Sequence, residues 1–113
     1  MATQLNSLSH FNKEEIPNCK TLKIALVVST WNQEITNKLK EGAENTLIEC
    51  GVQKKNILVY HVPGSYELIF GAKIAAKKNP DAIICLGSVI QGETKHFDFV
   101  CNAVSNGIKD LNI

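Results

Sequence analysis

The chain contains no arginine, so all twelve of its basic residues are lysines. Arginine is the usual bidentate clamp for a phosphate group, and any phosphate site in this chain must therefore rely on other donors. The formal net charge is only +1 at pH 7. This balance provides no electrostatic basis for binding nucleic acid or an anionic membrane, and we expect neither as a partner.

Closely spaced cysteines are also missing. The four cysteines (Cys19, Cys50, Cys85 and Cys101) stand far apart, with no C-x-x-C pair and no histidine at metal-ligand spacing. We therefore expect no metal site and interpret the thiols as small hydrophobic groups. The N-terminus lacks the apolar stretch of a signal peptide, and no apolar run is long enough to span a membrane. These absences favour a cytoplasmic protein with reduced thiols.

The composition is that of an ordinary globular domain, with 44% hydrophobic and 20% charged residues. A length of 113 residues allows one core but not two, so residues 1–113 are expected to form a single domain. Residues 1–21 are polar and irregular and predict an N-terminal arm outside the core. Residues 22–113 carry the hydrophobic periodicity of an α/β core.

Strand and helix patterns alternate along this core. Strands are predicted at 22–29, 56–62 and 82–90, because these runs are apolar and rich in β-branched residues. Helices are predicted at about 30–50, where Thr30 and Gln33 have capping-box spacing and Gly51 marks the end, at 66–79, and at 95–110. Strands separated by helices pair in parallel through right-handed crossovers. The predicted fold is a three-layer αβα sandwich with a mostly parallel, flavodoxin-like sheet.

In such sheets, ligands bind beyond the carboxyl ends of the strands. The loops at 29–32, 62–67 and 87–96 fall there, and each combines small or polar residues with one functional group. Trp31 could stack on a heteroaromatic ring or could cover the core as a rim residue. Glu67 could accept hydrogen bonds from a polyol, or could be a carboxylate favoured by the helix dipole.

The third loop predicts an anion site beside a proton-transfer group. Gly92, Glu93 and Thr94 precede a helix, where free backbone N–H groups and the positive end of the dipole favour an anion. Lys95 adds a positive charge. His96 follows in the first turn, where the dipole favours a neutral imidazole that can accept a proton near pH 7. His10 and His61 lie in the arm and in a strand and are interpreted as structural.

Three motifs in this order resemble the 6,7-dimethyl-8-ribityllumazine synthase family: WN after the first strand, PGSYE after the second, and GSVIQGETKHFDFV after the third. The resemblance runs from about Leu22 to the end of the chain. It implies a transferase that condenses 5-amino-6-ribitylamino-pyrimidinedione with 3,4-dihydroxy-2-butanone 4-phosphate. The reaction releases phosphate and water, is the penultimate step of riboflavin biosynthesis, and uses no cofactor.

The resemblance also implies a role for each motif residue. Trp31 would stack on the pyrimidine ring, Ser65 and Glu67 would hold the ribityl chain, and His96 would transfer protons. Val89 and Ile90 would line the ring pocket. The phosphate would bind to Gly92, Glu93 and Thr94. The full set of implied substrate-binding residues is Trp31, Asn32, Gly64, Ser65, Tyr66, Glu67, Ser88, Val89, Ile90, Gly92, Glu93 and Thr94.

Members of this family form homopentamers, some of which assemble into icosahedral shells with active sites between subunits. The resemblance therefore implies a homo-oligomer in which the polar arm pairs with a neighbouring sheet. An alternative from another class stays open, namely a non-catalytic flavin- or lumazine-binding α/β module that holds its ligand on Trp31.

The family continues beyond the point that corresponds to Ile113, with a further strand and a helical portion that carry a phosphate-binding arginine. The α/β core at 22–113 is therefore expected to be incomplete at its C-terminus and to represent a fragment. We expect the 113-residue chain alone to be poorly soluble or much less active than a longer form.

Overall fold

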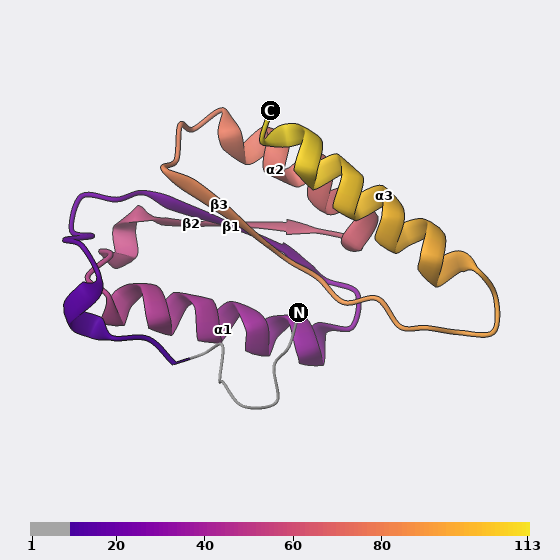
Figure 1. Ribbon diagram of the computed structural model, residues 1–113, viewed down its shortest axis with the longest axis horizontal. Helices are drawn as coiled ribbons and strands as arrows, with labels where there is room; N and C mark the ends of the chain where they lie inside the picture. Colours follow the sequence, from indigo (N-terminus) through magenta and orange to yellow (C-terminus); the bar gives the residue numbers. More distant parts are fainter. Residues whose placement is uncertain (1–9) are drawn as a thin grey trace.

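A computed structural model describes residues 10–113 of the chain. Its three strands, β1 (Ile24–Ser29), β2 (Ile57–Val62) and β3 (Ala82–Leu86), form one parallel sheet in the order β2-β1-β3. Helix α1 (Gln33–Glu49) covers one face of the sheet, and α2 (Leu68–Ala76) and α3 (His96–Leu111) lie on the other side (Figure 1). The predicted parallel αβα sandwich is confirmed.

The central strand β1 builds both halves of the core. All six of its residues are buried, which explains its continuous apolar sequence. Ile24, Leu26 and Val28 face α1 and cluster with Val52, whereas side chains on the opposite face cluster with α2. The residues of that second cluster are Ala25, Val27, Leu68 and Ala75. Alternation along one strand therefore holds the two helical layers together.

The segment before β1 takes part in the first of these clusters. Cys19 is buried, and Ile16 and Leu22 pack against the same apolar cluster. The burial of Cys19 and the packing of Ile16 differ from the expectation that residues 1–21 stand outside the core, because a few apolar side chains suffice to anchor a polar segment. The earlier part of the predicted arm, residues 1–9, lies outside the described residues.

The start of α1 corrects a prediction. Thr30 does not cap the helix, because its N–H donates to the Val62 carbonyl at 2.8 Å and its hydroxyl to the Pro63 carbonyl at 3.4 Å. Both groups thus extend the pairing of β1 with β2. Helix α1 begins at Gln33 instead, after Asn32 in the left-handed conformation with φ of 61°. At the other end, Gly51 has φ of 105° and terminates the helix as predicted.

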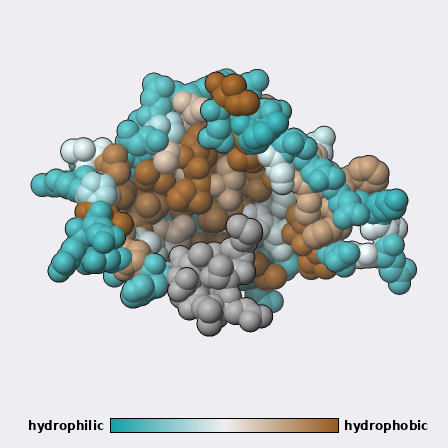
Figure 2. All heavy atoms as spheres, viewed as in Figure 1, coloured by the Kyte–Doolittle hydropathy of each residue, from teal (hydrophilic) through white to brown (hydrophobic). Residues whose placement is uncertain are grey.

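The last strand is shorter than predicted, and the helix that follows it is loosely packed. Strand β3 ends at Leu86 rather than at Ile90, and residues 87–95 form a long loop that leads to α3 (Figure 1). Helix α3 lies beside α2, and none of its residues is buried. A cavity of about 390 Å³ separates its apolar face from β3, lined among others by Cys85, Cys101, Val104 and Ile108. Apolar side chains gather over the middle of the face shown in Figure 2.

Candidate active site

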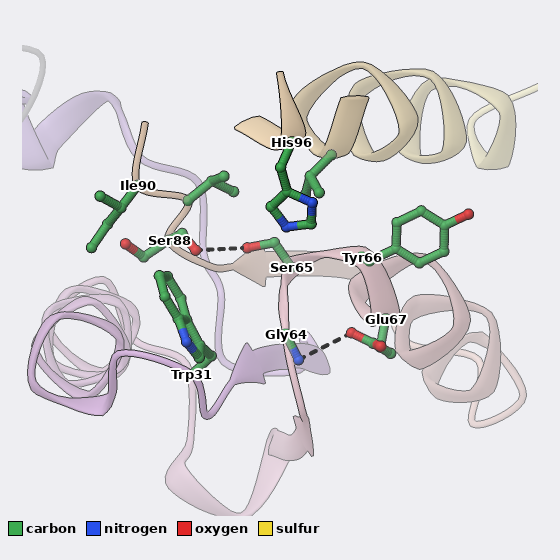
Figure 3. A pocket seen from close by; sticks show the side chains of 10 residues that line it. Trp31, Gly64, Ser65, Tyr66, Glu67, Ser88, Ile90 and His96 are labelled. Atoms are coloured by element: carbon green, nitrogen blue, oxygen red, sulfur yellow. Dashed lines mark hydrogen bonds between the residues drawn. The ribbon is translucent and has the colours of Figure 1, made fainter. Parts of the chain in front are cut away.

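A cavity of about 580 Å³ opens at the carboxyl edge of the sheet, where the three predicted loops meet. This volume lies within the usual range for small-molecule sites. The lining comes from the end of β1, the turn after β2, the loop after β3 and the start of α3 (Figure 3). Its residues are Trp31, Gly64, Ser65, Tyr66, Glu67, Ser88, Val89, Ile90, His96 and Val100.

Ser88 joins the loops at the floor of this cavity. The Ser65 hydroxyl donates to the Ser88 carbonyl at 3.1 Å (Figure 3). The Asn32 amide nitrogen lies 3.5 Å from the Ser88 hydroxyl. Gly87 permits this close approach. A Cβ at position 87 would lie 2.5 Å from Ser65 Oγ and 2.9 Å from Leu68 Cδ1. A side chain at position 87, directly after β3, would therefore have to displace Ser65 or Leu68 in the segment after β2.

Glu67 has a local structural role as well as a place in the lining. Its carboxylate accepts a hydrogen bond from the Gly64 N–H at 3.1 Å and so stabilises the short 3-10 turn Ser65–Glu67 that precedes α2. The structural role expected for a carboxylate here is an interaction with the helix dipole, whereas the structure shows a capping bond. Because only one carboxylate oxygen is engaged in this bond, the other can accept a hydrogen bond from a ligand hydroxyl.

Trp31 and His96 enter the cavity from opposite sides. The backbone N–H of Trp31 donates to the Pro63 carbonyl at 2.9 Å and so holds this part of the chain against the turn after β2. About half of the residue's surface (51%) stays exposed. His96 is the first residue of α3, and its ring points toward Ser65 (Figure 3). The exposed Trp31 indole and the His96 imidazole thus lie on opposite sides of the cavity. The indole can stack on a ring, and the imidazole can accept or donate a proton.

The predicted anion-binding residues lie beside the cavity rather than in its lining. Gly92, Glu93 and Thr94 are exposed on the loop before α3. The Thr94 hydroxyl oxygen accepts a hydrogen bond from the His96 N–H at 3.4 Å, and its own proton remains available to an anion. Asn32 contacts Ser88 but does not line the cavity.

Sequence reasoning missed one lining residue, Val100. It is the last residue of the third sequence motif and has no predicted role there, yet it lines the cavity together with His96. The signal was its spacing, because residues four positions apart share one face of a helix. In the described part of the chain, no group of three histidine, cysteine, aspartate or glutamate side chains could hold a metal ion, and no helix is long and apolar enough to cross a membrane.

Comparison of the sequence with known proteins points to one family. The family model described as 6,7-dimethyl-8-ribityllumazine synthase matches residues 21–113. Proteins of that name are similar over the whole chain, with 55% identity in Christiangramia forsetii, 53% in Flavobacterium johnsoniae and 49% in Parabacteroides distasonis. The chain spans 68%, 60% and 71% of the lengths of these three relatives, respectively.

Proposed function

Because the chain belongs to the 6,7-dimethyl-8-ribityllumazine synthase family, we propose that the protein condenses 5-amino-6-ribitylamino-pyrimidinedione with 3,4-dihydroxy-2-butanone 4-phosphate. The products are 6,7-dimethyl-8-ribityllumazine, phosphate and water. The observation that carries the proposal is the cavity in which Trp31 and His96 face each other across the ends of three parallel strands.

The pyrimidine ring would stack on Trp31, with its edge against the backbone of Val89 and Ile90. The ribityl chain would run toward Ser65 and Glu67. The Ser65 hydroxyl already donates its proton to the Ser88 carbonyl, so it would serve the ribityl chain as an acceptor. Glu67 would accept a hydroxyl proton at the carboxylate oxygen that does not bind Gly64. Both residues therefore select hydroxyl groups, which suits a polyol.

The phosphate of the second substrate would bind at the loop before α3. Gly92 and Glu93 would contribute main-chain N–H groups, and Thr94 would contribute its hydroxyl proton. The positive end of the α3 dipole favours an anion at this place. Lys95 is exposed next to it and supplies a positive charge without arginine. This arrangement would hold the phosphate beside His96, close to the bond that must break.

The reaction needs amine attack on a ketone, loss of phosphate and ring closure, and each step moves protons. His96 would accept and return these protons between the two bound substrates. Holding both reactants together can remove roughly 7–11 kcal/mol from such a barrier in favourable cases. A positioned acid–base group adds about a hundredfold to ten-thousandfold. None of the steps requires a strong nucleophile.

Turnover and ligand binding together test this proposal against a binding module. The protein is mixed with both substrates, and lumazine formation is followed by absorbance. In parallel, riboflavin or the lumazine is titrated while tryptophan emission is recorded, with Trp31→Phe as the control. Turnover together with quenching that depends on Trp31 supports the proposal. Quenching without turnover, in a longer form of the protein as well as in the 113-residue chain, would identify a non-catalytic module. Failure of both turnover and quenching would favour a generic α/β domain.

We also infer that the protein is a homo-oligomer, as a pentamer or a shell built from pentamers. Among residues 10–113, β2 and β3 each have one edge without a pairing strand. Tyr66, Phe70 and Phe99 expose 60%, 66% and 70% of their surfaces. Unpaired strand edges and large exposed aromatic side chains are typical of surfaces that contact another chain. Light scattering at micromolar concentration tests the inference, and a mass of one chain throughout would reject it.

The state of the four cysteines suggests the cellular compartment. Cys19, Cys50, Cys85 and Cys101 are all free thiols in the structure. Free thiols persist in reducing compartments, so we propose a cytoplasmic protein. Cells that express the protein with a tag at its N- or C-terminus can be fractionated to test this location. Recovery of the tagged protein outside the cytoplasmic fraction would contradict it.

A further inference from the structure

The backbone of Asn32 has an unusual conformation next to the proposed ring-stacking residue. Its φ of 61° and ψ of 53° place it in the left-handed region. Within the described residues, only Asn79 shares a positive φ among residues other than glycine. The left-handed region is costly for residues with a Cβ, and asparagine and aspartate tolerate it better than most. A sequence that places asparagine here meets a backbone requirement.

This requirement comes from an abrupt change of direction on both sides of Asn32. Before it, the Thr30 and Trp31 N–H groups donate to Val62 and Pro63, which keeps the chain in line with β1. Directly after it, the Asn32 carbonyl accepts from the N–H groups of Ile35 and Thr36 and begins α1. The chain passes from strand pairing to helix within one residue, and the left-handed turn makes this possible.

The left-handed turn at Asn32 affects the orientation of the preceding residue, Trp31. Its N–H is fixed to Pro63, so the rotation at Asn32 determines where the chain departs and leaves the indole at the cavity wall (Figure 3). We propose that Asn32 is a positioning residue whose left-handed backbone holds Trp31 in the orientation needed for stacking. The inference rests on the proposed function for its catalytic consequence but not for its structural claim.

Substitution by alanine and by glycine separates the backbone from the side chain. Asn32→Ala and Asn32→Gly both remove the amide, including its contact with Ser88, but only glycine adopts the left-handed region without cost. With glycine, the near-UV circular dichroism and emission of Trp31 should match the wild type. With alanine, both spectra should change. The Trp31 signal is isolated by subtracting spectra of the same variants that also carry Trp31→Phe.

Kinetics on the full-length protein give a second readout. A misplaced Trp31 indole should raise the KM for the pyrimidine substrate. We therefore expect kcat/KM of Asn32→Ala to fall about tenfold to a hundredfold below that of Asn32→Gly. Because the two variants lack the same amide, any direct contact between this side chain and a substrate cancels in the ratio. Asn32→Asp keeps a residue that tolerates the left-handed region and should preserve the Trp31 spectra, which covers the case in which the alanine variant does not fold.

Asn79 provides a matched control at the opposite edge of the sheet. It has φ of 53°, is exposed, and precedes β3 far from the cavity. Asn79→Ala should be less stable than Asn79→Gly but should leave both the Trp31 spectra and kcat/KM unchanged. Equal Trp31 spectra for Asn32→Ala and Asn32→Gly would overturn the proposal, as would an altered spectrum in Asn32→Asp. These spectra need no substrate, so they decide the matter even if the protein forms no lumazine.

Discussion

At the scale of single residues, Gly87 determines how closely the loops of the site approach. A Cβ at this position would meet Ser65 Oγ at 2.5 Å and Leu68 Cδ1 at 2.9 Å. We expect Gly87→Ala to push the turn after β2 away from β3 and to weaken the bond between Ser65 and Ser88. Overpacking of this kind costs about 1–3 kcal/mol. Urea unfolding measures the loss, and a stability equal to that of the wild type would show that the contact relaxes freely.

Cys85 is a partly buried thiol in β3. Burial raises the pKa of its thiol above the usual value of 9.0, because the thiolate is poorly solvated there. The unfolded chain then ionises at lower pH than the folded one. The stability from this group is complete below the unfolded pKa and is lost as pH rises through the folded pKa. The free energy of unfolding of Cys85→Ala should therefore fall less between pH 8 and pH 11 than that of the wild type, and parallel slopes would contradict the shift.

At the scale of helices and strands, two glycines in helix interiors should respond to alanine in opposite ways. Gly42 in α1 has no atom within 4 Å of its would-be Cβ, so Gly42→Ala should gain about 0.5–1 kcal/mol of stability from helix propensity. At Gly71 in α2, the same Cβ would lie 2.6 Å from Val27 and 2.8 Å from Val62. Gly71→Ala should be destabilising by about 1–3 kcal/mol. Thermal unfolding of both variants tests the pair, and an equal sign for the two would refute the packing of α2 on the sheet.

The kind and order of the elements could be predicted from the sequence because each has a strong hydrophobic period. The mostly apolar run 22–29 has the pattern of a strand covered on both faces, and the observed strand Ile24–Ser29 is buried throughout. Their ends could not be predicted in the same way. Thr30 had the spacing of a helix cap but bonds to Val62 and Pro63, which lie more than thirty residues away in the chain. Local spacing carries no information about such partners.

The candidate site followed from topology more than from any single residue. Parallel strands place the loops after β1, β2 and β3 at one edge, so Trp31, Ser65 and Ser88 could be expected together. The path of residues 87–95 could not be derived, since it has no periodicity. This loop decides that His96 points into the cavity while Gly92, Glu93 and Thr94 lie outside its lining. The roles of these residues stay predictions.

At the scale of the whole molecule, the helices cover both faces of the sheet incompletely. On one face α1 has a single buried residue, Thr36. On the other face α3 has no buried residue and leaves a cavity of about 390 Å³ over β3. The start of α3 carries His96. A helix held mainly by α2 and the Ser65–Glu67 turn can therefore move with the loop that precedes it, and assembly with other copies would stabilise it.

The central claim is that this cavity makes lumazine with His96 as its proton-transfer group. The most direct test compares the wild-type protein with His96→Ala, following lumazine formation from both substrates at saturating and limiting concentrations. His61→Ala is the matched control, because His61 is exposed on β2 and does not line the cavity. We predict that kcat/KM falls about a hundredfold to ten-thousandfold in His96→Ala and stays at the wild-type value in His61→Ala. A folded His96→Ala variant with wild-type kcat/KM would contradict the account.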